Sequence, residues 1–379
     1  MRVSRRSFFR HSALSATAAA IAAAIPESLL ALEPPRHPKA KGKTGDPAPV
    51  LLNSNENPYG AFPSVLNAMI LSLNVANRYP DYEFDALWDG LGKLHNAKTE
   101  EIALGAGSTD LLRMAAEAFC TSKKRIVTAA PTFEALAMYA QRRNVEVTTV
   151  PLRTGDHAHD LDGMLRAAKD SGAGLVYICN PNNPTGTITP RAEIEQFIAK
   201  MPSETYLLID EAYHHFVDSQ FYQSFADKRS DNPRVFVLRT FSKIFGMAGL
   251  RVGYAVGTKE TIDQLSKNYV FDSPNCVGAR AASAGLKDTT ALAAMESRMK
   301  GDRERFMAEA QKRKLTTLPS QANFVMMDTG KPIRTVIDYF KTKNVMIGRP
   351  FPPYDTYARI SLGTPGEMQK FWMVWDGMS

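Results

Sequence analysis

The stretch Arg239-Thr-Phe-Ser-Lys-Ile-Phe-Gly-Met-Ala-Gly-Leu-Arg251 holds Lys243 directly after a hydroxyl residue and eight residues before an arginine. Upstream of it, Asp210 ends the apolar run Tyr206-Leu-Leu-Ile-Asp210. Further upstream lies the polar turn Asn180-Pro-Asn-Asn-Pro-Thr-Gly186. Ligands of an open α/β sheet bind beyond the carboxyl ends of its strands, so these three segments are expected to meet at one sheet edge.

The pattern around these segments predicts an α/β fold. From about residue 53 to 265, short apolar runs alternate with longer amphipathic stretches, which is typical of a mostly parallel sheet covered by helices. We predict strands at 125–129, 146–150, 175–179, 206–210, 234–238 and 253–256. We predict helices at 109–120, 134–142, 161–171, 190–200 and 259–269.

The last third of the chain has a different pattern. A long charged helix is predicted at 289–315, followed by a strand at 323–328, a helix at 332–343 and strands at 345–347 and 357–362. A further helix is predicted to begin near Pro365, because proline suits the first turn of a helix. These elements indicate a smaller α+β domain.

The segments at Lys243, Asp210 and Asn180–Gly186 suit covalent binding of pyridoxal 5′-phosphate. Lys243 would form the Schiff base with the cofactor aldehyde, which requires a neutral amine, and burial or a nearby cation lowers the pKa of a lysine. Asp210 follows an apolar strand and is therefore expected to be buried. A protonated pyridine nitrogen is the partner that a buried carboxylate needs, and it makes the ring an electron sink.

Other residues near these segments predict contacts to the cofactor phosphate. The turn Gly105-Ala-Gly-Ser-Thr-Asp110 opens a helix, and free N–H groups at a helix N-terminus bind anions. Arg251 can clamp a phosphate in bidentate fashion, and Thr240 and Ser242 offer hydroxyl donors. Ordinary turn capping by these hydroxyl residues is the alternative interpretation.

Three more side chains are candidates for contacts to the cofactor ring. Tyr213 and Asn183 are placed to reach a ring oxygen, and Phe133 to stack on the ring face. Core packing is the alternative for both aromatic residues.

Composition excludes several other classes of protein. The 379 residues are 44% hydrophobic and 22% charged, as in soluble globular chains. The net charge is +7, but residues 1–31 carry +3 of it, from four arginines and one glutamate. The remaining charge is modest and no basic-aromatic pattern accompanies it, so we do not predict nucleic-acid binding. Cys120, Cys179 and Cys276 are expected to be reduced thiols rather than a disulfide framework. Without a Cys/His cluster at ligand spacing, we predict no metal site.

The N-terminus resembles an export signal. Ser4-Arg5-Arg6-Ser7-Phe8-Phe9-Arg10 is a twin-arginine pattern, and the Ala-rich stretch after it is too short and weakly apolar for a stable membrane span. We therefore predict a signal peptide at 1–31 and a periplasmic protein; a first helix of a cytoplasmic enzyme is the alternative. Residues 32–52 are rich in proline and lysine and are interpreted as an N-terminal arm.

Seven motifs occur in an order that resembles the class I/II aminotransferases of fold type I, and most closely the histidinol-phosphate aminotransferase group. The resemblance covers about residues 50–365. The motifs are Asn53-Ser-Asn-Glu-Asn-Pro-Tyr-Gly60, Gly105–Asp110, Asn180–Gly186, Asp210-Glu-Ala-Tyr213, Thr240-Phe-Ser-Lys243, Gly249-Leu-Arg251 and Tyr357-Ala-Arg-Ile-Ser-Leu-Gly363.

The resemblance implies an α/β fold with a large, mostly parallel seven-stranded sheet domain (53–270), a small α+β domain (271–379) and a homodimer. It implies that Lys243 is the Schiff-base lysine and Asp210 the partner of the pyridine nitrogen. The other implied cofactor contacts are Asn183 and Tyr213 at the phenolic oxygen, Phe133 at the ring face, Tyr59 from the neighbouring subunit, and Ser108, Thr109, Thr240, Ser242 and Arg251 around the phosphate. Asp110, in the same turn as Ser108 and Thr109, is also expected to bind the cofactor. The implied substrate contacts are Arg359, Arg349, Asn323 and Asn183.

The predicted activity is a ping-pong transfer of an amino group between an amino acid, or a histidinol phosphate-like amine, and a 2-oxo acid. Two alternatives remain open at this stage. One is a pyridoxal-phosphate decarboxylase with the same cofactor residues, and the other is a non-catalytic binding protein on the same scaffold.

Overall fold

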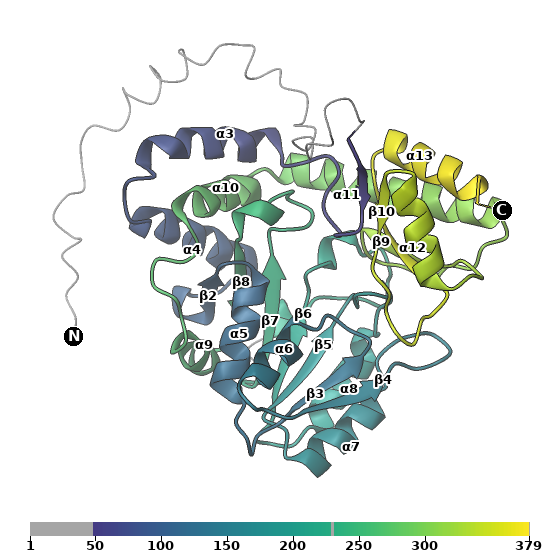
Figure 1. Cartoon of the computed structure of the whole chain (residues 1–379). Coiled ribbons are helices and arrows are strands. Elements are labelled where there is room, and N and C mark those ends of the chain that lie inside the picture. The colour runs from purple at the N-terminus through teal and green to yellow at the C-terminus, as the bar shows by residue number, and fades with distance from the viewer. Residues whose placement is uncertain (1–47, 229–230, 379) are drawn as a thin grey trace, which may run out of the picture.

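A seven-stranded sheet forms the centre of the computed structural model, which describes residues 48–228 and 231–378 (Figure 1). Its strands follow the order β2-β8-β7-β6-β5-β3-β4. Strand β8 is antiparallel to both of its neighbours, and the other pairings are parallel. This confirms the predicted large, mostly parallel sheet. The strands are β2 (Ile102–Gly105), β3 (Ile126–Ala130), β4 (Val147–Pro151), β5 (Leu175–Cys179), β6 (Tyr206–Asp210), β7 (Val235–Thr240) and β8 (Gly253–Val256).

The central strands are buried on both faces, which explains their continuous apolar sequences. Side chains alternate between the faces of a strand, so Tyr177 packs with helices α5, α6 and α9 while Ile178 packs with α7 and α8. Helices α3, α4 and α10 pack against one another at the edge that carries β2. The helices are α3 (Pro63–Ser72), α4 (Asp81–His95), α5 (Ser108–Phe119), α6 (Ala135–Arg142), α7 (Leu161–Ser171), α8 (Arg191–Lys200), α9 (Lys259–Ser266) and α10 (Cys276–Lys287).

The remaining elements form a smaller α+β unit beside the sheet (Figure 1). Strands β9 (Phe324–Asp328) and β11 (Tyr357–Ser361) pair antiparallel, and β1 (Val50–Leu52) pairs parallel with β10 (Val345–Ile347). The strand Val50–Leu52 lies in the segment interpreted as an arm, and its pairing joins the start of the described chain to the C-terminal unit. The helices of this unit are α11 (Thr289–Lys312), α12 (Ile333–Thr342) and α13 (Pro365–Asp376).

Most predicted elements agree with the structure to within a few residues, and the start of α13 shows why. Thr364 and Glu367 form a reciprocal capping box around Pro365, a signal that is local in the sequence. The prediction did not include β1, β2, α3, α4 and α10. Strands β1 and β2 are only three and four residues long, so their periodicity is too short to recognise.

A buried ion pair lies directly behind the end of β6. Arg239 donates from Nε and Nη2 to Oε2 of Glu211 at 3.1 and 2.9 Å, and both side chains are almost completely buried. Glu211 also accepts hydrogen bonds from the Ser224 hydroxyl and the Phe225 N–H. Removal of one partner would leave a buried, uncompensated charge.

We therefore expect Glu211→Ala to lower the free energy of unfolding by about 3–5 kcal/mol, measured by urea denaturation. The matched control is Glu193→Ala, which breaks the half-exposed pair with Arg153 and should cost less than about 1 kcal/mol. Equal losses in the two variants would contradict a special role for burial.

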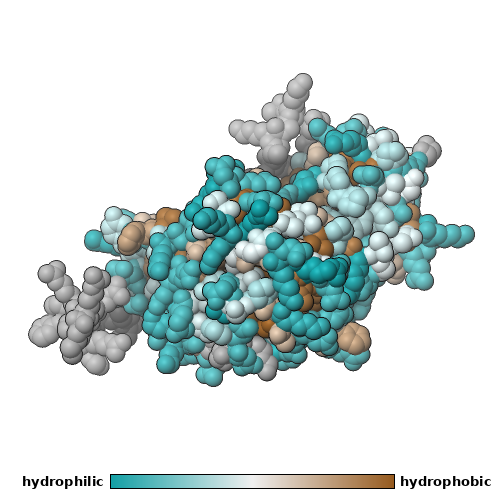
Figure 2. Space-filling model, turned by 90° about the horizontal axis from the view of Figure 1, so that it is seen from below, coloured by the Kyte–Doolittle hydropathy of each residue, from teal (hydrophilic) through white to brown (hydrophobic). Residues whose placement is uncertain are grey.

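No helix within residues 48–228 and 231–378 is long and apolar enough to cross a membrane. The export signal predicted for residues 1–31 lies outside the described residues, as does most of the predicted arm. The face of the molecule in Figure 2 is largely hydrophilic, with hydrophobic side chains in small patches.

Candidate active site

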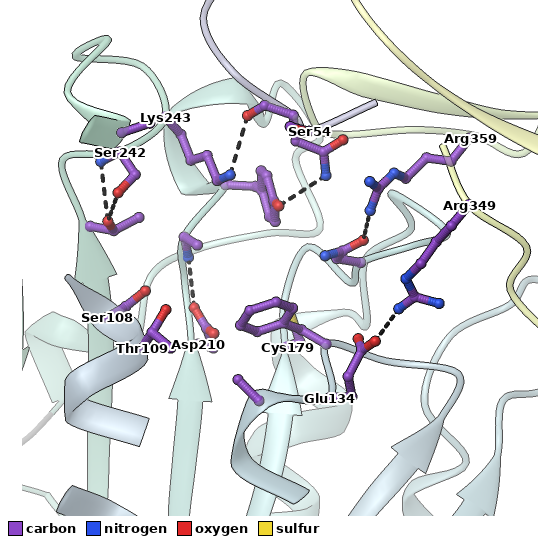
Figure 3. A pocket seen from close by; sticks show the side chains of 18 of the residues that line it. Ser54, Ser108, Thr109, Glu134, Cys179, Asp210, Ser242, Lys243, Arg349 and Arg359 are labelled. Carbon is purple, nitrogen blue, oxygen red and sulfur yellow. Dashed lines mark hydrogen bonds and ion pairs between the residues drawn. The ribbon is translucent and has the colours of Figure 1, made fainter. Parts of the chain in front are cut away.

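A pocket of about 820 Å³ opens at the carboxyl ends of β5, β6 and β7. The large sheet unit supplies most of its wall, and the C-terminal unit closes one side with Ile337, Ile347, Arg349, Pro350 and Arg359. Figure 3 shows the side chains converging on this space from both units. The lining includes most of the predicted site residues, namely Ser108, Thr109, Phe133, Asn183, Asp210, Tyr213, Thr240, Ser242, Lys243, Arg251, Arg349 and Arg359.

Lys243 projects into the pocket from the loop after β7. Its Nζ donates to the carbonyl oxygen of Asn55 at 3.2 Å and lies 5.5 Å from the centre of the Tyr213 ring. Burial, followed by the positive charge of Arg359, lowers the pKa of Lys243 to about 8. The neutral form of this amine is therefore far more populated near physiological pH than in an ordinary lysine, and a nucleophilic lysine must be neutral.

Asp210 is the last residue of β6, and only 2% of its surface is exposed. Its carboxylate accepts hydrogen bonds from the Tyr177 hydroxyl at 2.9 Å and the Ala212 N–H at 3.1 Å. Burial raises the pKa of Asp210 to about 6 because the charged form loses its hydration. A cationic ring nitrogen in the pocket would stabilise the ionised carboxylate, which makes Asp210 suitable for the predicted role.

The residues predicted to hold a phosphate lie together at one end of the pocket. Arg251 donates to the Ser242 hydroxyl at 3.2 Å, and Thr240 donates to the same oxygen at 2.9 Å. Helix α5 begins beside them, and no side chain caps its first N–H groups. Gly107, at φ +79°, lets the arginine approach: a Cβ atom there would lie 2.2 Å from Nη2 of Arg251. The Arg251 guanidinium, the hydroxyls of Thr240 and Ser242 and the N-terminus of α5 together form a set of hydrogen-bond donors that fits a phosphate.

Arg359 lies on β11 on the opposite side of the pocket, and 8% of its surface is exposed. It donates from Nη1 to Oδ1 of Asn183 and from Nη2 to the carbonyl oxygen of Asn53, both at 2.7 Å. Its buried Nε has no hydrogen-bond partner among the described residues, and burial lowers its pKa to about 10. An unpaired buried donor costs free energy, so this side chain is suited to an anionic ligand.

The remaining ring contacts also lie in the pocket. The Tyr213 hydroxyl accepts a hydrogen bond from Nδ2 of Asn55 at 3.1 Å, and Phe133 forms part of the wall. Asn55, which also contacts Lys243, was not a predicted site residue, although it lies within a motif that carried the resemblance. Its importance depends on a contact between segments almost two hundred residues apart.

Arg349 lies at the mouth of the pocket, where it forms an ion pair with Glu134 (Figure 3). The two side chains are about half exposed. Glu134 was also not among the predicted site residues. A glutamate that follows Phe133 carries no local signal of function, because its partner is more than two hundred residues away.

Three predicted site residues do not line the pocket. Asp110 accepts from the Ala106 N–H and pairs with Arg113, so it stabilises the start of α5. The Tyr59 hydroxyl donates to Asp302 at 2.8 Å; its predicted contact to a neighbouring subunit stays a prediction. Asn323 donates to the carbonyl oxygens of Asn55 and Glu56, which supports the segment beneath Lys243.

Within residues 48–228 and 231–378, no three His, Cys, Asp or Glu side chains cluster in a way that could hold a metal ion. Cys120 and Cys179 are buried free thiols, and Cys276 is partly exposed.

Comparison with known proteins identifies relatives along most of the chain. The family model "Aminotransferase class I and II" matches residues 47–372. Histidinol-phosphate aminotransferase 2 of Methylococcus capsulatus is 34% identical, covering 86% of this chain and 89% of that protein. The aromatic amino acid aminotransferase of Rhodococcus jostii is 35% identical over the same shares. The crystal structure of histidinol-phosphate aminotransferase from Sinorhizobium meliloti with pyridoxal 5′-phosphate has a TM-score of 0.81 at 28% identity, covering 87% of this chain and 91% of that one.

Proposed function

The chain belongs to the class I and II aminotransferases, which use pyridoxal 5′-phosphate, and from this premise we propose which reaction it carries out. The proposed reaction transfers an amino group from an amino acid, or a histidinol phosphate-like amine, to a 2-oxo acid in two successive half-reactions at one site. We propose a ping-pong order because Lys243, Asp210 and Arg359 share a single pocket, so the amino donor and the 2-oxo acid would occupy the same site one after the other.

One arrangement carries this proposal. Lys243, with its pKa lowered to about 8, shares a pocket with the buried carboxylate of Asp210 and the buried guanidinium of Arg359. A nucleophile, a carboxylate for a ring cation and a cation for a substrate carboxylate are the groups that transamination requires. Perturbed pKa values that cluster in one pocket are typical of an active site.

Pyridoxal 5′-phosphate, when bound, supplies an aldehyde for amines and a ring that accepts electrons from the substrate. Ser108, Thr109, Thr240, Ser242 and Arg251 would hold its phosphate, and Lys243 would hold its aldehyde carbon. Once a substrate amine takes that position, the freed Nζ of Lys243 can take the proton from the substrate's α carbon and later return a proton as a general acid.

Two further side chains support this proton transfer. Asp210, buried in the pocket lining, would keep the ring nitrogen of the bound cofactor protonated, and through the cationic ring it would stabilise negative charge that develops on the substrate carbon. Arg359 binds the substrate carboxylate and orients the α carbon toward Nζ of Lys243. The C-terminal unit and the segment at Asn53–Asn55 form part of the wall around these groups.

The test is a panel of amino donors with 2-oxoglutarate and the purified protein loaded with cofactor. Absorbance reports conversion of the bound cofactor from its aldehyde to its amine form. If no donor causes this change, transamination fails as the function. Release of carbon dioxide without a 2-oxo acid would instead identify a decarboxylase.

The pH dependence of cofactor capture follows from the lowered pKa of Lys243. Only the neutral amine attacks an aldehyde, so the capture rate of cofactor-free protein should rise with pH through a midpoint near 8. Stopped-flow absorbance between about pH 7 and 10 measures this rate, with Lys243→Ala as the blank. A midpoint near the ordinary lysine value of 10.5 would contradict the effect of burial.

We also propose that the chain acts as a homodimer. Several large apolar side chains are strongly exposed in the single chain, among them Leu73, Tyr79, Tyr82 and Phe271. These side chains are candidates for contacts with a second copy of the chain if they gather into one patch in the dimer interface. Light scattering measures the mass in solution, and a monomer at micromolar concentration would rule the proposal out.

Export by the twin-arginine route remains a further proposal, based on Ser4–Arg10 and the Ala-rich stretch after it. Residues 1–31 fused to a folded reporter should carry that reporter to the periplasm, measured by cell fractionation. Replacement of Arg5 and Arg6 by lysine should block the transfer. A cytoplasmic reporter, or export that survives the double replacement, would count against this route.

A further inference from the structure

Glu134 lines the pocket and directly precedes helix α6. It occupies the position before Ala135 with helical backbone angles, and its side chain makes no capping hydrogen bond to the helix. The carboxylate is instead directed across the mouth of the pocket to Arg349 of the C-terminal unit (Figure 3). Glu134 therefore contributes a charge to the pocket, and the helix does not use that charge for capping.

Arg349 and Arg359 are neighbours at this end of the pocket. Their guanidinium carbons lie 4.2 and 4.7 Å from the centre of one ring, that of Phe351. Arg359 is buried, whereas about half of the Arg349 side chain is exposed. Both guanidinium groups also line the same pocket, so we expect a substrate held by its α-carboxylate at Arg359 to bring its side chain near Arg349.

The electrostatic coupling among these groups is direct. The charge of Arg349 lowers the pKa of Arg359, and the charge of Glu134 raises it. Glu134 thus acts on the substrate end of the pocket in two ways. It offsets the positive charge of Arg349, and its own negative charge would repel a carboxylate on a substrate side chain. The neighbouring wall residues Ile337, Ile347 and Pro350 offer apolar contacts.

We propose that Glu134 is a specificity-determining residue that competes with a substrate's second carboxylate for Arg349. This inference rests on the proposed aminotransferase function. A substrate with an uncharged side chain leaves the ion pair intact and packs against the apolar wall. An acidic substrate must displace Glu134 from Arg349 and then lie beside a free carboxylate. Because the Glu134–Arg349 ion pair is half exposed, breaking it costs little free energy. The pocket therefore accepts both acidic and uncharged substrates but favours the uncharged ones.

The first test compares phenylalanine and glutamate as amino donors in the single half-reaction, without an acceptor. In Glu134→Gln, the ratio of kcat/KM for glutamate to that for phenylalanine should rise about three- to fivefold, the change that corresponds to loss of one exposed ion pair. The matched control is Glu193→Gln, which removes a charge from a half-exposed arginine pair outside the pocket and should keep the wild-type ratio.

Arg349→Gln should lower the same ratio, and the double variant Glu134→Gln/Arg349→Gln should lose the gain of Glu134→Gln. A double-mutant cycle of this kind attributes the gain to the exchange at Arg349. The inference is overturned if Glu134→Gln changes both donors equally, leaves the ratio at the wild-type value, or keeps its gain in the double variant.

A binding measurement separates this inference from the proposed function. Glutarate has two carboxylates and 3-phenylpropionate has one, and neither carries an amino group. Calorimetry on the cofactor-loaded protein should show that Glu134→Gln tightens glutarate binding about three- to fivefold relative to 3-phenylpropionate. A protein that converts no amino donor would refute the aminotransferase proposal, whereas equal shifts for the two acids would refute the role of Glu134 alone.

Discussion

Replacement of Lys243 by alanine is expected to reduce transamination turnover by about 10⁴-fold, because the side chain supplies both the covalent attachment and the general base. The position of Nζ in the pocket and its pKa near 8 are the physical basis. Lys243→Arg should be equally inactive, since arginine keeps a positive charge but is never neutral at these pH values.

The measurement is single-turnover conversion of the bound cofactor with an amino donor. Lys259→Ala is the matched control, because that lysine lies on the surface at the start of α9 and pairs only with its own helix among the described residues. Full turnover by Lys243→Ala would remove the lysine from its assigned role.

Replacement of Asp210 by asparagine is expected to lower turnover by roughly 10³-fold, as loss of one preorganised electrostatic group commonly does. Asparagine has nearly the same shape: its Oδ1 can still accept from the Ala212 N–H, and its Nδ2 would donate to the Tyr177 hydroxyl, which donates to the carboxylate in the wild type. The loss would therefore report the missing charge opposite the ring nitrogen rather than a change of packing.

Measurements of folding stability show whether Asp210→Asn loses turnover through its missing charge or through a damaged fold. Burial raises the pKa of Asp210 in the folded protein from 3.8 to about 6, so the folded state binds the proton more tightly than the unfolded state. The contribution of this group to stability is therefore present at low pH and is lost as pH rises from about 4 to 6. In cofactor-free protein, Asp210→Asn should lack this loss and be no less stable than wild type at pH 7.

Urea unfolding of the two proteins at several pH values provides the measurement, with Asp89→Asn at an exposed position of α4 as the control. An Asp210→Asn protein that is markedly destabilised at pH 7 would show that the carboxylate serves the fold. Unchanged turnover in that variant would exclude Asp210 as the partner of the ring nitrogen.

Local patterns in the sequence were sufficient for the fold class. The run Tyr206–Asp210 is apolar at every position before its final aspartate, because this strand is covered on both faces. The start of α13 carries its own capping signal. Such features depend on residues only a few positions apart, so they can be recognised in the sequence. The order of the polar turns after these strands was also enough to predict the cofactor.

Tertiary structure alone decided which distant residues meet. Asn55 reaches Lys243 and Tyr213, Glu134 reaches Arg349, and the strand Val50–Leu52 joins the C-terminal unit. None of these pairings has a local signature, because each depends on how the two units pack and on which side chains this packing brings within hydrogen-bonding distance. The residues of the pocket could be predicted from short motifs, whereas the ion pair at its mouth depends on the packing of the whole chain.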